Sequence, residues 1–238
     1  MRRINERAYV REQYETEDRL RARKAAYKNA EGDDPREFAF EAIAEARPRQ
    51  VLEVGGGEGE LAERIVNELR AELVAIDQSE RMVELQRSKG IDASVGDVQE
   101  LPFANAEFDV AVAAWVLFHV PDLGRAVAEL ARVLKPAGRL VAVTSSTEHF
   151  QDLWERAGGT NPHSRFNFRS KNGAEILERH FRHVERRDAR GATTMDPDTI
   201  RRFAASSENL SAVAAVADSG ETIRVRTHST IFVAVGPA

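Results

Sequence analysis

The sequence predicts an α/β fold in which a doubly wound, open sheet carries helices on both faces. Between residues 50 and 146, five short apolar runs alternate with segments of helical periodicity, which is the order of a largely parallel sheet with crossover helices. The run at 108–120 is almost continuously apolar, as expected for a strand that is buried on both faces. A chain of 238 residues suits one main core of this class.

The elements are expected in a simple order. Residues 5–30 form a surface helix with scattered apolar positions, and a second helix starts at Pro35 and ends before Pro48. Strands are expected within residues 50–54, 71–79, 91–103, 108–120, 135–146, 183–195 and 223–236, the last as one long strand or a hairpin. Further helices are expected within residues 61–69, 79–90, 123–134, 170–181 with Ser170 as the cap, and 196–217. Residues 149–170 lack a sustained period, which is typical of a functional loop or lid.

Composition excludes several classes of protein. The chain has no cysteine, which excludes disulfide scaffolds, thiolate zinc sites, iron–sulfur clusters and a cysteine nucleophile. The N-terminal residues have no signal-peptide core, and no run of 18 apolar residues occurs, so we expect a cytoplasmic protein with no membrane partner. A formal charge of −5 argues against nucleic acid as the main partner.

A glycine cluster, EVGGGEG, directly follows the strand at 50–54. Its glycines allow a sharp turn and close approach of a ligand to the backbone. The dinucleotide fingerprint G-x-G-x-x-G does not fit, because its third glycine would fall on Glu60, and no Gly-Lys-Ser/Thr of a P-loop follows. Glu53 lies two residues before the first glycine. An acidic group at this edge suits a cationic ligand better than a pyrophosphate.

Two more acids follow the next strands. Asp77 ends the second strand of the core, where doubly wound folds place an acid that accepts hydrogen bonds from ribose hydroxyls. Asp97 follows the third strand, where its carboxylate can accept from an exocyclic amine while the Val98 N–H donates to a ring nitrogen. Three acidic strand ends around one glycine turn predict a site for a nucleoside that carries positive charge.

These motifs together resemble class I S-adenosylmethionine-dependent methyltransferases of the ubiquinone/menaquinone-biosynthesis-like type. The matching text is VLEVGGGEGELAERI, LVAIDQSERMVE, GDVQELPFANAEFDVAVAAWVLFHVPD and LARVLKPAGRLVAV, within residues 51–143. The resemblance implies a Rossmann-like, seven-stranded sheet whose last strand is antiparallel. It implies one methyltransferase domain over 1–238, with a helical cap at 1–48, a cofactor-binding core at 49–146 and an acceptor-side lid with the final strands at 147–238.

The resemblance also implies roles for individual residues, with S-adenosyl-L-methionine as the cofactor and S-adenosyl-L-homocysteine as its product. The acid and glycines of the first strand end would cradle the methionyl part, Asp77 the ribose, and Asp97 with Val98 the adenine. Gly56 stands where relatives commonly have Cys or Ser, and we expect no harm to cofactor binding. Besides Asp77, Asp97 and Val98, the set comprises Glu53, Gly55, Gly56, Gly57 and Gly59 at the turn, Gln78 and Met82 beside the adenosine, and Ala113, Ala114 and Trp115 at the methionyl end.

The end of the fourth core strand separates subtypes of this family. The motif Asn/Asp-Pro-Pro-Tyr of amino methyltransferases is absent there. Cytosine-C5 methyltransferases are excluded because they need a cysteine, and magnesium-dependent catechol-type enzymes are excluded because residues 113–118 offer no carboxylate. The expected activity is therefore metal-independent methyl transfer to O, N or C of a small-molecule metabolite, in secondary metabolism. Two alternatives stay open. The first is a protein that binds the cofactor without catalysis or acts as a partner subunit. The second is an RNA-modifying methyltransferase. A monomer or homodimer is expected.

Candidates for acceptor chemistry are less constrained by the sequence. His119 is the first candidate for a general base, or else a structural histidine in a His-x-x-Asp turn with Asp122. Each of the remaining candidates could instead be an ordinary loop, lid or surface residue without a functional role. They are His149 and His163 in the irregular segment; Trp115, His149, Trp154, Phe166 and Phe168 as residues of the acceptor pocket; and Tyr14, Arg19 and Arg23, which would cap the cofactor.

Overall fold

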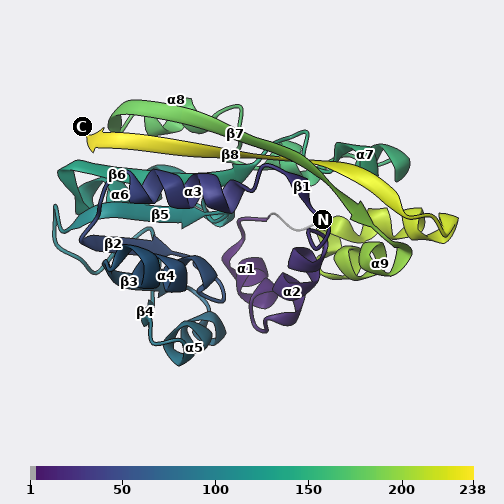
Figure 1. Cartoon of the computed structure of the whole chain (residues 1–238), viewed down its shortest axis with the longest axis horizontal. Helices are drawn as coiled ribbons and strands as arrows, with labels where there is room; N and C mark the ends of the chain where they lie inside the picture. Colours follow the sequence, from purple (N-terminus) through teal and green to yellow (C-terminus); the bar gives the residue numbers. More distant parts are fainter. Residues whose placement is uncertain (1–3) are drawn as a thin grey trace.

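Eight strands form one mixed sheet in the computed structural model, which describes residues 4–238 and, for Arg7, the backbone alone. The strand order is β1-β7-β8-β6-β5-β2-β3-β4 (Figure 1). The strands are β1 Glu31–Gly32, β2 Gln50–Val54, β3 Glu72–Asp77, β4 Asp92–Val95, β5 Phe108–Ala114, β6 Leu134–Ser145, β7 Phe181–Met195 and β8 Ile223–Pro237.

Helices connect and cover these strands. The α-helices are α1 Arg7–Gln13, α2 Asp18–Ala25, α3 Pro35–Ala44, α4 Glu60–Arg64, α5 Glu80–Ser88, α6 Leu123–Val133, α7 Gln151–Arg156, α8 Gly173–Leu177 and α9 Pro197–Ala205. A π-helical turn, η1 Ile65–Leu69, continues α4, and the 3₁₀ segments are η2 Leu117–His119, η3 Pro162–Arg165 and η4 Glu208–Ser219.

The sheet topology confirms the predicted doubly wound fold. Strands β2 to β6 run parallel to their neighbours, and β8 inserts antiparallel between β6 and β7. Apolar side chains of α3, α4 and α5 pack on one face, and those of α6 and α8 pack on the other. The strand count is eight rather than seven, because the two-residue β1 pairs with the outer edge of β7.

The N-terminal region differs from the prediction of one helix over residues 5–30. It forms two helices, α1 and α2, separated at residues 14–17. The break lies against α5: the Ser79 hydroxyl donates to the Tyr14 carbonyl oxygen at 2.6 Å, and Arg81 forms an ion pair with Glu17. Contacts with a distant part of the chain therefore end α1, and the α2 segment turns to pack on α9 (Figure 1).

Three further boundaries need correction. Strand β5 ends at Ala114 rather than continuing to residue 120, because Trp115 adopts φ of 57°. Ser170 does not cap α8, which begins at Gly173 with Asn172 in the N-cap position. The expected helix at 196–217 is α-helical only to Ala205 and continues as the 3₁₀ segment η4. Residues 223–236 form one long strand within β8, not a hairpin.

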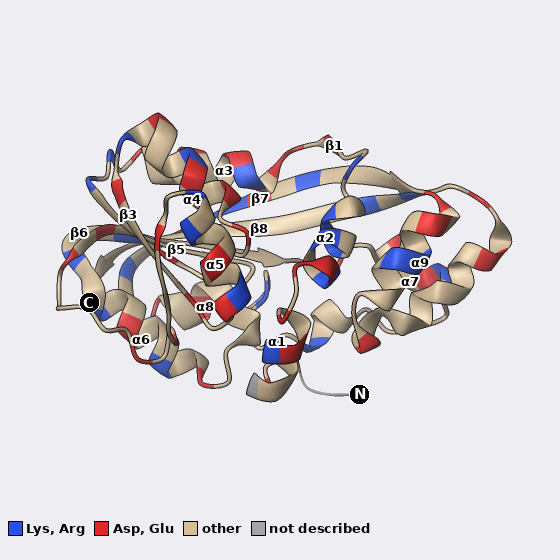
Figure 2. Ribbon diagram, turned by 90° about the horizontal axis from the view of Figure 1, so that it is seen from below, with Lys and Arg blue, Asp and Glu red and all other residues tan. Residues whose placement is uncertain are grey.

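A third apolar cluster lies apart from the two faces of the sheet. It joins α7, α9 and η4 to the first residues of β8. Charges of both signs lie on the neighbouring helices α1, α2 and α9 (Figure 2). Of the helices within residues 4–238, none is long and apolar enough to cross a bilayer.

Candidate functional site

The glycine turn lies between the β5–α6 loop and the N-terminal helices. Gly55 has φ of 65°, and a Cβ there would overlap the Val116 side chain. Gly57 has φ of 57°, and a Cβ there would lie 3.2 Å from Leu20 of α2. Gly59, at φ of 76°, is the N-cap of α4. The turn therefore needs glycine both for its backbone conformation and for its close neighbours.

Glu53 is buried directly behind this turn. Its carboxyl group occupies the space that a Cβ of Gly56 would need, and only 1% of the residue is exposed. Its Oε2 has no hydrogen-bond partner among the described residues. Burial, and then the negative charge of Asp77, raises the pKa of Glu53 to about 7. The site thus holds a buried carboxyl group that lacks a counter-ion.

Asp77 is the second acid of the site and ends β3. The Ser79 N–H donates to its carboxylate at 2.9 Å, and the N–H groups of Gly57 and Gln78 also favour its charged form. Burial outweighs them and raises the pKa of Asp77 to about 6. Gln86 of α5 is buried and donates to the Gly57 carbonyl oxygen at 2.8 Å, so α5 holds the glycine turn against this acid.

Asp97 follows β4 and is held by Gln99. The Gln99 backbone N–H donates to Asp97 Oδ1, and the Gln99 side-chain amide reaches both carboxylate oxygens, each at 2.9 Å. The Gln99 side-chain oxygen in turn accepts from the Asp122 N–H at 2.9 Å. Val98 and Met82 are buried beside these elements. The sequence analysis did not single out Gln99 or Gln86. The only indication for them in the sequence was their short separation from Asp97 and Met82.

Trp115 follows β5 in a conformation that large side chains seldom adopt. Its φ is 57°, and its N–H donates to the Val143 carbonyl oxygen at 2.9 Å. A bulky residue with positive φ is an outlier that surrounding structure must enforce, and such outliers cluster at functional sites. Ala113 is fully buried, whereas Ala114 and Trp115 are half-buried at the strand end.

The N-terminal helices bring Tyr14 and Arg23 to the same edge. The Arg23 guanidinium lies over the Tyr14 ring at 5.3 Å from its centroid and donates to the Ser206 carbonyl oxygen at 3.2 Å. Its Nη2 is buried and has no partner among the described residues. Arg19, by contrast, pairs with Glu12 of α1.

His119 is enclosed by its own chain. Its Nε2 lies 3.1 Å from the Tyr14 hydroxyl, and its Nδ1 lies 3.1 Å from the Ile4 carbonyl oxygen. Burial lowers the pKa of His119 to about 4, so the ring is neutral near pH 7. Asp122 does not form the expected turn with it but caps α6, where its Oδ1 accepts from the Arg125 N–H at 3.0 Å.

The aromatic candidates for the acceptor side divide into two groups. Phe166 stacks on Phe118 at 4.3 Å, and His163 and His149 continue the row of rings. Phe166 and Phe168 both belong to the main core, where Phe168 packs against Phe232, and Trp154 packs in the cluster with α9. For all three the structure shows packing, and a role in acceptor binding stays a prediction.

Comparison with known proteins finds relatives of the region that contains the glycine turn and the three acids. Residues 52–142 match the family model described as a methyltransferase domain. The matched region is similar to class I S-adenosylmethionine-dependent methyltransferase domains.

Individual relatives agree with this assignment. The ubiquinone/menaquinone biosynthesis C-methyltransferase of Ralstonia pickettii (strain 12J) is 32% identical over 124 residues, which cover 48% of this chain and 49% of that protein. The chain therefore spans about half the length of the curated relatives it matches. Among solved structures, YcgJ of Bacillus subtilis has a TM-score of 0.61 at 17% identity, covering 85% of this chain and 99% of that one. The [4+2]-cyclase SpnF has a TM-score of 0.63 at 18% identity, covering 96% of both chains, and shows the same fold.

Residues of the candidate site, from the matched region and from α2, fit the cofactor of this class. The amino-acid end of S-adenosylmethionine carries an ammonium and a carboxylate group. Among residues 4–238, Glu53 Oε2 of the matched region is a buried acceptor without a partner, and Arg23 Nη2 of α2 is a buried donor without one. Buried charged groups are ordinarily paired. The Glu53 carboxyl group is therefore complementary in charge to the ammonium group of the cofactor, and the Arg23 guanidinium is complementary to its carboxylate group.

Proposed function

We propose that this chain transfers the methyl group of S-adenosylmethionine to an O, N or C atom of a small-molecule acceptor, without a metal ion. One observation carries the proposal: the buried Glu53 and the half-buried Asp77 converge behind one glycine turn, and Glu53 Oε2 has no partner within residues 4–238. A cationic ligand would satisfy both acids, and a sulfonium compound with an ammonium group is such a ligand.

The roles of the residues follow from their place in this arrangement. Glu53 binds the ammonium group, Arg23 the carboxylate, and Asp77 the ribose hydroxyls. Asp97, with the Val98 N–H, binds the adenine. Gln78 and Met82 flank the adenosine, the glycines at 55–57 and 59 allow close approach, and Ala114 and Trp115 face the methionyl end.

When bound, the cofactor supplies a methyl carbon that is activated by the positive sulfur. The protein has to align the acceptor with that carbon and exclude water. Helices α1 and α2 cover the glycine turn, as the contact between Leu20 and Gly57 indicates. His119 acts by positioning Tyr14, because both of its ring nitrogens are engaged within the chain.

A metal-independent reaction is supported by the chemistry of the side chains present. Within residues 4–238, no group of three or more His, Asp and Glu side chains is arranged to hold a metal ion. The loop after β5 presents Trp115, Val116 and Leu117, which offer no ligand for a hard cation.

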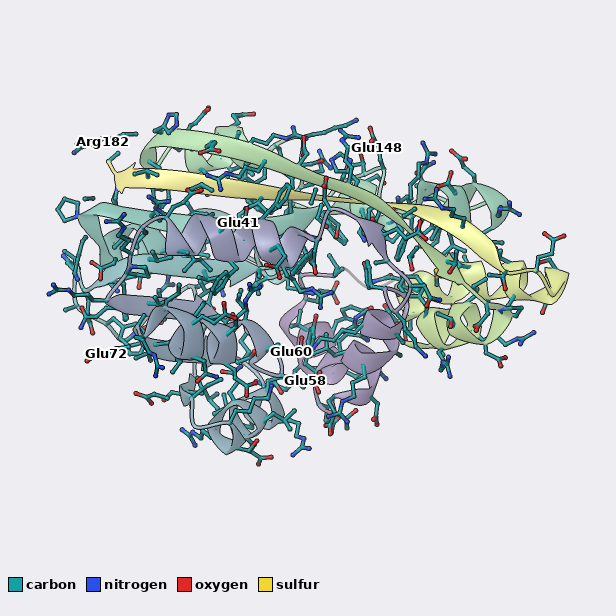
Figure 3. All side chains as sticks on the ribbon, viewed as in Figure 1. Glu41, Glu58, Glu60, Glu72, Glu148 and Arg182 are labelled. Carbon is teal, nitrogen blue, oxygen red and sulfur yellow. The ribbon has the colours of Figure 1, made fainter. Side chains whose placement is uncertain are left out.

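Binding of S-adenosylhomocysteine measured by calorimetry tests the site. Asp77→Ala should weaken binding by about tenfold or more, since one charge-assisted hydrogen bond contributes about 1.5–3 kcal/mol. The matched control is Glu72→Ala, an exposed acid at the opposite end of the same strand (Figure 3), which should leave affinity unchanged. Equal affinity of the Asp77→Ala and wild-type proteins would refute the assignment.

Turnover separates the enzyme from its alternatives. Labelled S-adenosylmethionine incubated with a panel of phenols, amines and 1,3-dicarbonyl compounds should give a labelled product. Tight cofactor binding with no product from any acceptor favours a non-catalytic or partner-subunit role. RNA that co-purifies with the protein and becomes labelled favours the RNA-modifying alternative.

A further inference from the structure

The end of the β6–β8 ladder is closed by a histidine side chain. The last backbone pair is Ser145 with Ser229. Beyond it, the Ser146 N–H donates to the His228 carbonyl oxygen at 2.9 Å, and the His228 N–H donates to Nδ1 of His149 at 3.0 Å. The His149 ring thus takes the place of a backbone acceptor.

Two contacts compete at Nδ1 of His149: the His228 N–H at 3.0 Å needs a lone pair there, and the His228 carbonyl oxygen at 3.1 Å would accept from a proton there. We assign the ring proton to Nε2, because the His228 N–H then has an acceptor and the neutral ring carries one proton. Burial lowers the pKa of His149 well below its usual range, so the ring is neutral. The His228 carbonyl oxygen, 3.1 Å from the same Nδ1, already has the Ser146 N–H as its donor.

The protonated Nε2 of His149 faces Tyr27, which follows α2. The Tyr27 hydroxyl oxygen lies 2.7 Å from Nε2 and therefore accepts this hydrogen bond. Its own proton is left to donate elsewhere, and no second partner of this hydroxyl occurs among the described residues. The Tyr27 ring is fixed by stacking on Phe150 at 5.4 Å. In this arrangement the hydroxyl of the half-buried Tyr27 keeps a proton that it can donate.

Tyr27 lies near Arg23, which the proposed function assigns to the cofactor. It follows Arg23 by one helical turn, and the Arg23 charge acts on the Tyr27 phenol. His149 contacts the ring of His163 at 5.3 Å, and Nδ1 of His163 is buried without a partner among the described residues. Through Phe166, the same row of rings reaches the loop after β5.

We propose that Tyr27 is a substrate-binding residue whose hydroxyl donates a hydrogen bond to a carbonyl or oxyanion oxygen of the methyl acceptor. His149 is the positioning residue that turns the Tyr27 proton toward the acceptor. The inference rests on the proposed function and extends it to the acceptor. No proton is transferred at Tyr27: the hydrogen bond orients the acceptor and stabilises negative charge on its oxygen.

The tautomer of His149 tests the proposal in the wild-type protein. Ring ¹⁵N chemical shifts, assigned with a His149→Gln variant, should show Nε2 protonated and Nδ1 unprotonated at neutral pH. A proton on Nδ1 would overturn the proposal, because the Tyr27 hydroxyl would then donate its hydrogen bond to Nε2 of His149 and could not donate to the acceptor. This measurement needs neither an acceptor nor bound cofactor.

A binding experiment tests the hydroxyl itself. The probe is 4-nitrophenolate, an aryl oxyanion whose absorbance reports binding, added to protein saturated with S-adenosylhomocysteine. The wild type should bind it, and Tyr27→Phe should bind it about tenfold more weakly or worse, with unchanged affinity for S-adenosylhomocysteine. The control is Tyr9→Phe, a buried tyrosine whose hydroxyl is already paired with Ser207 and Asn209.

The possible outcomes are distinct. Equal probe affinity of Tyr27→Phe and wild type, or no probe binding by the wild type, would overturn the role of Tyr27. Failure of the wild type to bind S-adenosylhomocysteine would instead count against the proposed function. Weaker probe binding by Tyr9→Phe, to the same extent as by Tyr27→Phe, would show a general packing effect and also overturn the proposal.

Discussion

The buried carboxyl group of Glu53 lowers the stability of the ligand-free protein. Burial raises its pKa from 4.5 to about 7. A raised carboxyl pKa favours the folded state at low pH, and this contribution is lost as pH rises from about 4.5 through about 7. Asp77 acts in the same direction, with a pKa raised to about 6. Both acids are kept where a neutral residue would fold better, which points to a ligand of opposite charge.

Replacing Glu53 by a neutral isostere should therefore separate stability from binding. Glu53→Gln should raise the free energy of unfolding at about pH 8 by about 2–3 kcal/mol, with a smaller gain at about pH 5. The same variant should bind S-adenosylhomocysteine at least about tenfold more weakly. Denaturant titration and calorimetry measure the two effects. Glu41→Gln, an exposed acid of α3 (Figure 3), is the control, and a Glu53→Gln protein that is less stable at the higher pH would contradict the argument.

Cofactor binding should also be linked to protons. Below the Glu53 pKa of about 7, a ligand with an ammonium group must displace the carboxyl proton. The affinity for S-adenosylhomocysteine should fall as pH falls, by at most about tenfold per pH unit for one group. Calorimetry at about pH 6 in buffers of different ionisation enthalpy should show proton release that Glu53→Gln reduces. Buffer-independent heats for the wild type would disprove the linkage.

For individual residues, the sequence predicts which acids form the site but not which side chains contact one another around it. Glu53, Asp77 and Asp97 each follow a strand, and parallel strand ends meet at one edge of a sheet, so their convergence is predictable. The pairing of Tyr27 with His149 is not, since it joins segments that are 122 residues apart. Nor does periodicity distinguish the ring contacts of two residues of the same core cluster: Phe166 stacks on Phe118, and Phe168 packs against Phe232.

Among the elements, α2 is tied to the glycine turn by ion pairs. Lys24 reaches both Glu58 and Glu60 at 2.9 Å, and Arg21 reaches Glu58 at 2.8 Å. Figure 3 shows Glu58 and Glu60 at the start of α4, beside α2. These pairs connect the cap to the loop that it covers. The break between α1 and α2 could not be predicted from local sequence, because it depends on contacts with α5.

Loosening these ion pairs should speed release of the cofactor product. Glu58→Gln should raise the dissociation rate of S-adenosylhomocysteine by about threefold, given about 0.2–1 kcal/mol for partly exposed pairs. Added salt should raise the wild-type rate and change the variant less, because salt screens such pairs. Stopped-flow fluorescence measures both. Glu175→Gln removes the exposed pair with Arg179 on α8 and should have no effect, whereas equal rates in Glu58→Gln and wild type would exclude the cap as a barrier.

For the whole molecule, the sequence predicts the parallel part of the sheet better than its outer part. Helices separate strands β2 to β6 along the chain except between β4 and β5, and most strands that are consecutive in sequence are neighbours in the sheet. Strand β8 instead inserts between β6 and β7, and this exchange of order leaves no trace in periodicity. The added strand β1 has two residues, too few to show a pattern.

The position of β8 predicts that residues 4–238 unfold as one cooperative unit. Phe232 of β8 is fully buried in the core shared with β5 and α6, so Phe232→Ala should cost about 3–5 kcal/mol throughout the molecule. The chain's two tryptophans report on separate regions: Trp115 lies at the glycine turn and Trp154 below α9. Trp115→Phe and Trp154→Phe each leave one probe, and both probes should show the same denaturation midpoint with and without Phe232→Ala. Separate midpoints would mean that the cofactor core and the acceptor side fold independently.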